Sequence, residues 1–214
     1  MGKLRIKSNV IGMIGTNCYI VYDDEIKKAV IIDPAENSSF ILNQCCELGV
    51  VPVAVLLTHG HADHIGAVPD LVRAFRLPVY AGKGEAKLLE DPSLNLSANF
   101  GEMMSVKQAE LLEDGQELSL LGRNWKVIAT PGHTSGSVCY YLEKETVLFS
   151  GDTLFCESYG RTDFPTGSSR DLIQSVTEKL LTLPEDVTVY PGHECQTSIG
   201  HEKKYNPLAS YRRY

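Results

Sequence analysis

Residues 58–66 read Thr-His-Gly-His-Ala-Asp-His-Ile-Gly, a stretch that places three histidines and one aspartate within six residues. It directly follows the apolar run 53–57, which has Pro52 before it and glycines after it and is typical of a buried strand. The histidines therefore lie where a strand runs out into a loop. Because His59 and His61 are two residues apart, an extended backbone would direct both imidazoles to the same side.

This loop has the composition of a metal site. The small residues Gly60 and Ala62 allow the chain to fold back, which can bring Asp63 and His64 to a second point nearby. Imidazole nitrogens combined with carboxylate oxygens suit zinc, and also iron or manganese. The alternative is a polar surface loop that happens to be rich in histidine, and the buried strand immediately before the loop argues against it.

Three other polar residues follow predicted strands in a similar way. His133 comes after the apolar run 127–129, Asp152 after 147–149 and His193 after 187–190, each directly preceded by a glycine. Each alone is weak evidence, because such a residue often serves only a turn. If these strand ends share one edge of the sheets, the loop and the three residues together supply five histidines and two aspartates, enough for two metal ions that share a carboxylate. His201 lacks this context, and we expect it at the surface.

The order of predicted elements favours an α+β fold, with residues 1–214 as a single domain. We expect strands at 4–10, 16–22, 29–32, 53–57, 78–80, 117–121, 125–129, 137–142, 146–149 and 187–190. We expect helices at 37–49, 67–75, 85–89 and from Ser168 onward. Residues 90–104 predict a long loop of the kind that often borders a functional site, and residues 192–214 a polar surface segment. Since strands occupy both halves and no linker divides them, we expect packed sheets with helices outside.

The composition excludes several classes of protein. A net charge of −7 argues against nucleic-acid binding, because no basic field is available to hold phosphates. No segment approaches the roughly 20 apolar residues that span a bilayer, so we expect no membrane partner. The six cysteines lack the spacing of a disulfide framework, and the N-terminal residues do not resemble a signal peptide. We therefore expect reduced cysteines and a cytoplasmic location.

The histidine-rich loop and the three later strand-end residues together resemble the metallo-β-lactamase-fold hydrolase superfamily, over nearly the whole chain. This resemblance implies an αββα sandwich, in which two packed mixed β-sheets carry helices on their outer faces. It also implies two divalent metal ions at one edge, with zinc expected and iron or manganese as alternatives. The implied ligands are His59, His61 and His133 for the first metal, Asp63, His64 and His193 for the second, and Asp152 as a bridge. Asp33 matches an aspartate that supports the metal loop without binding metal.

Residue types within this resemblance favour one branch of the family. Asp152 stands where several exported β-lactamases of the fold have cysteine, and His61 stands where redox-active di-iron relatives have glutamate. A site of histidines and aspartates with a bridging aspartate resembles the glyoxalase II group, the hydroxyacylglutathione hydrolases. The run Gly-Arg-Thr-Asp-Phe at 160–164 resembles a loop of small glyoxalase II-like hydrolases and also of persulfide dioxygenases.

We therefore expect a binuclear metallohydrolase that cleaves a small thioester. Two metal ions lower the pKa of a bridging water, and Asp63 is the expected catalytic residue because it can orient the resulting hydroxide. A thiolate leaving group needs little protonation, since the pKa of a thiol is about 8.5, and the sequence offers no strong general acid.

The chain departs from the glyoxalase II group in the parts that hold the substrate. Full-length members add a helical C-terminal domain that holds glutathione, whereas about 20 residues follow His193 here, too few for an independent domain. The group's lysine and tyrosine contacts to substrate are also missing, and we expect Arg161 to replace the lysine in part. We therefore expect this protein to share the group's thioester hydrolysis more closely than its specificity for glutathione.

Two other functions are weighed against thioester hydrolysis. An iron persulfide dioxygenase would use His59, His133 and Asp152 as its two-histidine, one-carboxylate triad, but it would leave Asp63, His64 and His193 with no metal to bind. A non-catalytic metal-binding module would need only four ligands for a closed structural site, whereas the sequence offers seven candidate ligands.

Overall fold

The computed structural model describes residues 2–211, so Met1 and residues 212–214 of the predicted domain lie outside the described range. The strands are β1 (Leu4–Ile11), β2 (Thr16–Asp23), β3 (Lys28–Ile32), β4 (Val51–Leu56), β5 (Val79–Gly82), β6 (Ala109–Leu112), β7 (Glu117–Leu120), β8 (Arg123–Ala129), β9 (Val138–Leu142), β10 (Val147–Gly151), β11 (Leu154–Phe155), β12 (Ser158–Tyr159), β13 (Thr188–Pro191) and β14 (Thr197–Ser198). The α-helices are α1 (Ser38–Leu48), α2 (Ala62–Ile65), α3 (Val68–Phe75), α4 (Ala86–Glu90), α5 (Ser169–Gln174) and α6 (Ile199–Tyr205).

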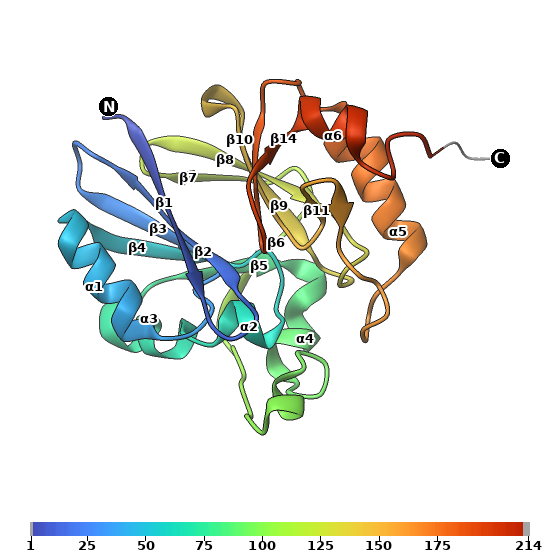
Figure 1. The fold of residues 1–214 in the computed structure, drawn as a ribbon. Helices are drawn as coiled ribbons and strands as arrows, with labels where there is room; N and C mark the ends of the chain where they lie inside the picture. Colours follow the sequence, from blue (N-terminus) through green and yellow to red (C-terminus); the bar gives the residue numbers. More distant parts are fainter. Residues whose placement is uncertain (1, 212–214) are drawn as a thin grey trace.

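Two mixed sheets make up the centre of the molecule (Figure 1). The first has the strand order β1-β2-β3-β4-β5-β6, with an antiparallel meander from β1 to β3 and parallel pairing from β3 to β6. The second has the order β14-β13-β10-β9-β8-β7, in which only β10 and β13 pair in parallel. Strands β11 and β12 form a separate small ribbon.

Helices α1, α3, α5 and α6 cover the outer faces of these sheets. Figure 1 shows α1 and α3 beside the first sheet and α5 and α6 beside the second, on opposite sides of the molecule. The layer order is therefore helix, sheet, sheet, helix, which is the αββα sandwich that the resemblance implied.

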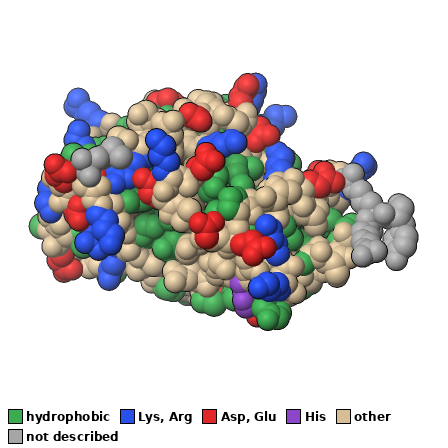
Figure 2. Space-filling model, turned by 90° about the horizontal axis from the view of Figure 1, so that it is seen from above, with side chains coloured by type: hydrophobic (Ala, Val, Ile, Leu, Met, Phe, Trp, Pro, Cys, Tyr) green, Lys and Arg blue, Asp and Glu red, His purple; other side chains and the backbone are tan. Residues whose placement is uncertain are grey.

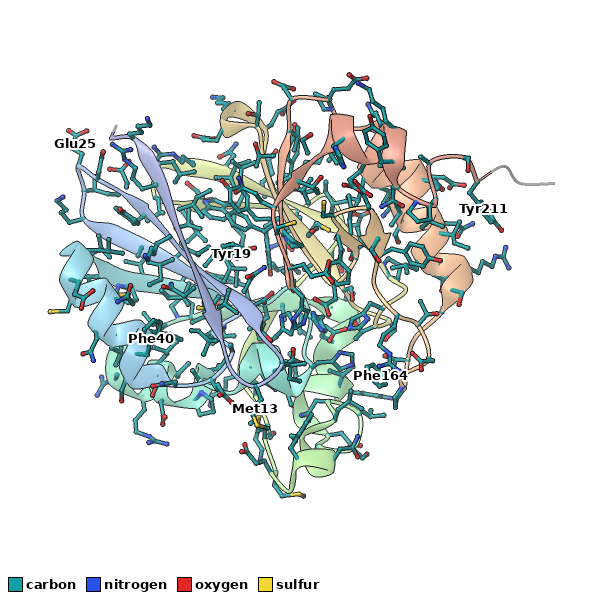
Figure 3. All side chains as sticks on the ribbon, viewed as in Figure 1. Met13, Tyr19, Glu25, Phe40, Phe164 and Tyr211 are labelled. Atoms are coloured by element: carbon teal, nitrogen blue, oxygen red, sulfur yellow. The ribbon has the colours of Figure 1, made fainter. Side chains whose placement is uncertain are left out.

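Alternation along strand β2 shows how the sequence builds these layers. Cys18 and Ile20 belong to the core between the first sheet and its helices, whereas Tyr19 and Val21 belong to the core between the two sheets. Figure 3 labels Tyr19 in this inter-sheet layer. Because successive side chains point to opposite faces and both faces are covered, the strand is buried along most of its length. A third core lies between the second sheet and the helices α5 and α6.

Most predicted elements are confirmed, and the exceptions have a common cause. Strands β6 and β14, the ribbon β11–β12 and helices α2 and α6 were not predicted. They are short, and their apolar residues are too few for a clear period: within α6 only Ile199 and Glu202 are buried. The predicted helix from Ser168 begins as α5 and then continues as a π-helical turn over Ser175–Lys179.

None of the helices within residues 2–211 is both long and apolar enough to cross a membrane. On the face shown in Figure 2, basic and acidic side chains are interspersed and apolar side chains lie between them. That face therefore carries no broad basic patch of the kind that holds nucleic acid.

Candidate metal centre

The seven predicted ligands come from five segments that meet at one edge of the sandwich. His59 and His61 lie in the loop after β4, and Asp63 and His64 lie on the short helix α2 that follows it. The other three come from loops directly after strands of the second sheet: His133 after β8, Asp152 after β10 and His193 after β13. The strand-end pattern in the sequence therefore predicted this convergence correctly.

The donor atoms form three overlapping groups, each with its atoms within 4.8 Å of one another. The groups are His59, His61 and His133; His59, His64 and Asp152; and Asp63, His64 and His193. The first and third groups match the two ligand sets that the resemblance implied. Asp152 groups with histidines of both sets, which is the position that a bridging carboxylate requires.

Buried donor atoms without partners show that these residues fit a metal. Among the described residues, Nε2 of His59, Nε2 of His64 and Oδ1 of Asp152 are buried and accept or donate no hydrogen bond. Nδ1 of His61 and Nε2 of His133 face each other at 3.0 Å. Buried polar atoms are normally paired, so a cluster of orphaned nitrogens and carboxylate oxygens is typical of a cation site.

The opposite ring nitrogens of three histidines contact oxygen atoms. Nδ1 of His133 lies 2.7 Å from the carbonyl oxygen of Arg161, and because a carbonyl can only accept, this nitrogen carries the proton. Nδ1 of His64 lies 3.0 Å from Oδ2 of Asp33, and Nδ1 of His59 lies 3.2 Å from the Thr58 hydroxyl. These contacts orient the rings so that Nε2 faces the cluster, an arrangement common around bound metals.

Asp33 has the supporting role that the resemblance implied. Its Oδ1 accepts a hydrogen bond of 2.8 Å from the backbone nitrogen of Thr58, and its Oδ2 accepts one of 2.6 Å from the Thr58 hydroxyl. Asp33 therefore anchors the first residue of the histidine-rich loop and contacts His64 at the same time.

Glu85 is a second supporting carboxylate, and it was missed from the sequence. This fully buried side chain accepts hydrogen bonds from the backbone nitrogens of Gly60 and Gly136 and from the Thr134 hydroxyl. It thereby ties the histidine-rich loop to the loop that carries His133. The only sequence signal was a glutamate within a predicted apolar helix, which is too common to single out.

The close approach of Gly192 to the centre explains why glycine precedes His193. A Cβ atom at position 192 would lie 2.1 Å from Oδ1 of Asp152 and 2.9 Å from Cε1 of His64. Any larger residue would therefore displace two predicted ligands.

Two of the three histidines of the first set, His59 and His61, are neutral. Burial lowers the pKa of His59 well below its ordinary value, and the neighbouring imidazoles add to the shift. Burial and the adjacent His133 lower the pKa of His61 to about 3. Both imidazoles therefore have a free lone pair at neutral pH, as metal binding requires.

In the second set, neighbouring carboxylates raise the pKa of the histidines. Burial opposes the charged form of His64, but Asp63, Asp152 and Asp33 outweigh it and raise the pKa of His64 to about 9. Burial also opposes the charged form of His193, whose contacts with Asp152 and Asp63 raise its pKa to about 10. This half of the site therefore attracts positive charge, and a metal ion would take the place of protons.

Five of the seven predicted ligands line a cavity of about 620 Å³, a size typical of small-molecule sites: His61, Asp63, His133, Asp152 and His193. Its walls include residues from the predicted loop 90–104, which confirms that loop as a border of the site. Arg161, the predicted substrate contact, also lines the cavity. Its guanidinium lies 4.0 Å from the centroid of the Phe164 ring and forms two hydrogen bonds with Asp163.

A further cluster of ligand-type residues lies around helix α6 and has a structural role. It comprises Cys156, His201 and Glu202. The Glu202 carboxylate already accepts hydrogen bonds from Thr197, Asn206 and the backbone of residue 157. His201 is partly exposed and contacts Glu157, as expected for a surface histidine.

Comparisons with known proteins agree with this geometry. The chain is 36% identical over 195 residues to the hydroxyacylglutathione hydrolase GloC of Haemophilus influenzae, covering 90% of this chain and 92% of that protein.

Three solved structures have the same fold. The BLEG-1 B3 metallo-β-lactamase superposes with a TM-score of 0.91 at 41% identity, covering 97% of this chain and 100% of that one. TTHA1623, described in a di-iron-bound form, has a TM-score of 0.83 at 34% identity, covering 94% and 99%. ETHE1 from Myxococcus xanthus has a TM-score of 0.80 at 31% identity, covering 95% and 83%.

The model of the metallo-β-lactamase superfamily matches residues 11–193, from the end of β1 to the last predicted ligand. The match includes all seven predicted metal ligands. This chain, with its αββα sandwich and its histidine and aspartate centre for divalent metal, belongs to the metallo-β-lactamase superfamily.

Proposed function

We propose that the protein is a binuclear metallohydrolase that cleaves thioesters. The proposed ligands are those that the sequence indicated: His59, His61 and His133 for one metal, Asp63, His64 and His193 for the other, and Asp152 between them. The donor types suit zinc, and the likeness to a protein described in a di-iron form keeps iron as an alternative.

The position of Asp152 is the observation that carries this proposal. Its Oδ1 lies 3.5 Å from Nε2 of His64, and its Oδ2 lies 3.5 Å from Nε2 of both His133 and His193. One carboxylate therefore faces histidines of both sets, which supports two metals with a shared ligand. A mononuclear site would have no use for the third group of donors.

When bound, the two metal ions supply Lewis acidity, which polarises the acyl carbonyl and lowers the pKa of water toward neutrality. Asp63 lines the cavity, and its Oδ2 accepts a hydrogen bond of 2.8 Å from the Thr16 hydroxyl. Despite burial, the nearby His64, His193 and Thr16 keep the pKa of the Asp63 carboxyl below its ordinary value. Asp63 is therefore ionised and can accept a hydrogen bond from the attacking water or hydroxide, which orients it toward the acyl carbon.

The leaving group favours a thioester over an amide. Water adds to the acyl carbon, the carbon–sulfur bond breaks with its electron pair on sulfur, and the products are a carboxylate, a thiol and a proton. A thiol has a pKa of about 8.5, so the thiolate departs without a general acid, whereas an amine must be protonated. The likeness to GloC, a named hydroxyacylglutathione hydrolase, supports the same reaction class.

The location of the enzyme forms part of the proposal. All six cysteines are free thiols in the described structure, and free thiols suit a reducing compartment. We therefore propose a cytoplasmic enzyme that acts on a small molecule.

A side-by-side assay tests this function. The metal-loaded protein is given S-lactoylglutathione, uncharged acyl thioesters, glutathione persulfide and a cephalosporin, and the release of thiol, the uptake of oxygen and the opening of the lactam are followed. We expect thioester turnover to exceed the other two activities by orders of magnitude. Oxygen uptake on the persulfide without thioester turnover would identify a dioxygenase instead, and dominant lactam opening would identify a β-lactamase.

A further inference from the structure

The walls above the metal centre are built from apolar side chains. Those that line the cavity are Ile14 from the tip of the β1–β2 hairpin, Leu96 and Phe100 from the segment after α4, and Phe155, Tyr159 and Phe164 from the segment after β10. Three separate parts of the chain therefore present apolar groups to one cavity that five of the predicted metal ligands also line. An apolar wall continuous with a reactive centre is suited to the part of a substrate that does not react.

Two of these lining side chains are open to solvent, and so are two methionines close to them in the sequence. Ile14 and Phe100 are each 55% exposed, and on the same two loops Met13 is 92% and Met103 78% exposed. Figure 3 labels Met13 and Phe164 on the same lower side of the molecule, where the hairpin ends. Large apolar side chains that gather at the border of a cavity, rather than singly, mark a surface that is covered when a ligand binds.

The charges of the walls do not suit a charged substrate. Apart from the predicted ligands, the ionised groups among the lining residues are Arg161 and Glu194. Nε and Nη2 of Arg161 bond to the two carboxylate oxygens of Asp163 at 2.7 and 2.6 Å, and the flat face of the guanidinium covers Phe164. Since this cation is already paired and Glu194 is negative, the described walls offer no unpaired cation to the two carboxylates of a glutathione moiety.

We propose that the preferred substrate is a thioester with an uncharged, apolar group larger than lactoyl, held between Ile14 and Phe100. The inference rests on the proposed thioester hydrolysis and names its substrate class. Ile14 and Phe100 are then specificity-determining residues, since they contact the substrate's apolar group and leave the reacting atoms to the ligand cluster. The apolar group belongs to the acyl half or to the thiol half of the substrate, and the experiment separates these two sources.

Two series of thioesters test the inference on the metal-loaded enzyme. The first varies the acyl group from acetyl through butanoyl and hexanoyl to octanoyl on N-acetylcysteamine, and the second varies the thiol of an acetyl thioester in the same steps. We expect kcat/KM to rise about two- to fourfold for each methylene that the walls bury, in one of the two series. The longest uncharged substrates should exceed S-lactoylglutathione.

Substitutions at the cavity walls test whether these residues cause the dependence of kcat/KM on chain length. Ile14→Ser and Phe100→Ser should each reduce the ratio of octanoyl to acetyl turnover at least tenfold, in whichever series shows the rise. Phe75→Ser is the matched control, because Phe75 is 42% exposed at the end of α3 and does not line the cavity. The control should keep the wild-type ratio. Equal loss of the ratio in all three variants would overturn the assignment.

A binding measurement separates the failure of this inference from the failure of the proposed function. S-octyl and S-methyl thioethers of N-acetylcysteamine cannot be hydrolysed, and calorimetry gives their affinities without turnover. Tighter binding of the octyl compound, without any thioester turnover, would support the apolar site and overturn thioester hydrolysis. Thioester turnover independent of chain length, with S-lactoylglutathione preferred and equal thioether affinities, would overturn the apolar site and leave hydrolysis standing.

Discussion

Oε2 of Glu85 lies 2.7 Å from the backbone nitrogen of Gly60, so a buried carboxylate holds the middle of the histidine-rich loop. Its other oxygen, Oε1, accepts hydrogen bonds of 2.6 Å from the Thr134 hydroxyl and 3.0 Å from the nitrogen of Gly136. Burial raises the pKa of this carboxyl, and the three donors oppose that shift. One side chain thus fixes the distance between loops from two different sheets.

Replacing Glu85, which is not itself a predicted ligand, should lower both the stability of the fold and the affinity for metal. Glu85→Ala leaves the backbone nitrogens of Gly60 and Gly136 without an acceptor and removes one of the two partners of the Thr134 hydroxyl, and we expect a loss of about 3 kcal/mol or more in the free energy of unfolding. Metal content after dialysis should fall as well, because His61 and His133 lose their common support. Urea unfolding and elemental analysis measure the two effects. Glu90→Ala, an exposed change at the end of α4, is the control, and equal stability of both variants would refute the supporting role.

Removal of metal should destabilise the fold. Orphaned nitrogens of His59 and His64 and an orphaned oxygen of Asp152 are buried at the site, so a chelator leaves them without partners. We expect close to two equivalents of zinc, iron or manganese per chain. A metal ion present at about a thousand times its Kd stabilises the folded state by about 4 kcal/mol. Chelation should therefore lower the melting temperature by several degrees, and added metal should restore it. A reproducible single iron, with no second site filling on titration, would favour the dioxygenase.

The sequence predicted those parts of the site that follow a repeated pattern. His133, Asp152 and His193 each follow a glycine after an apolar strand, and strands of one sheet bring such positions to one edge. The partners of these ligands have no such pattern. The carbonyl of Arg161 that orients His133 is a backbone atom, and its contact depends on a tertiary approach that leaves no trace in residue type.

The same distinction holds for the fold. Strands buried on both faces, such as β2, give apolar runs that predict them well. Helix α6 was missed because its burial depends on single contacts, such as the hydrogen bonds of Glu202, rather than on a stripe of apolar residues. The apolar cavity walls were missed for a related reason, since Ile14 lies in a hairpin turn and Phe100 ends a single 3₁₀ turn, where an isolated apolar residue carries no signal.

An ion pair between the two sheets predicts how stability depends on pH. Oδ2 of Asp23, at the end of β2, lies 2.8 Å from Nη1 of Arg123 in β8, and both side chains are buried. The backbone nitrogen of Ile26, together with Arg123, lowers the pKa of Asp23 from 3.8 to about 2. A carboxyl whose pKa is lower in the folded state contributes stability above its ordinary pKa, and this contribution is lost as the pH falls from about 4 to about 2.

Substitution of Asp23 should therefore change the acid response. We expect Asp23→Asn to be less stable than wild type at neutral pH and to lose less further stability between about pH 5 and about pH 3. Midpoints of urea unfolding at the two pH values measure the difference. Asp24→Asn serves as the control, because Asp24 is partly exposed and contacts Arg5 at the surface. Parallel acid responses of wild type and Asp23→Asn would show that this pair does not set the acid limit.

The last prediction concerns Asp152, the proposed bridge. Asp152→Asn keeps the shape of the side chain but removes its charge and one donor oxygen, so affinity should fall for both metals and thioester turnover should fall by orders of magnitude. His193→Ala should release mainly the second metal, because the other histidines and Asp152 still hold the first. The fold should persist in both variants, since the sandwich cores lie away from these side chains.

Metal content, melting temperature with excess metal and thioester turnover distinguish the two variants. Asp186→Asn, an exposed change before β13, controls for a general effect of replacing an aspartate. If Asp152 were only a turn residue, asparagine would fit its position nearly as well, and the variant would retain two metals and near-normal turnover. That result would refute the bridge. Loss of one metal in His193→Ala but of both in Asp152→Asn would establish it, because only a shared ligand couples the two sites.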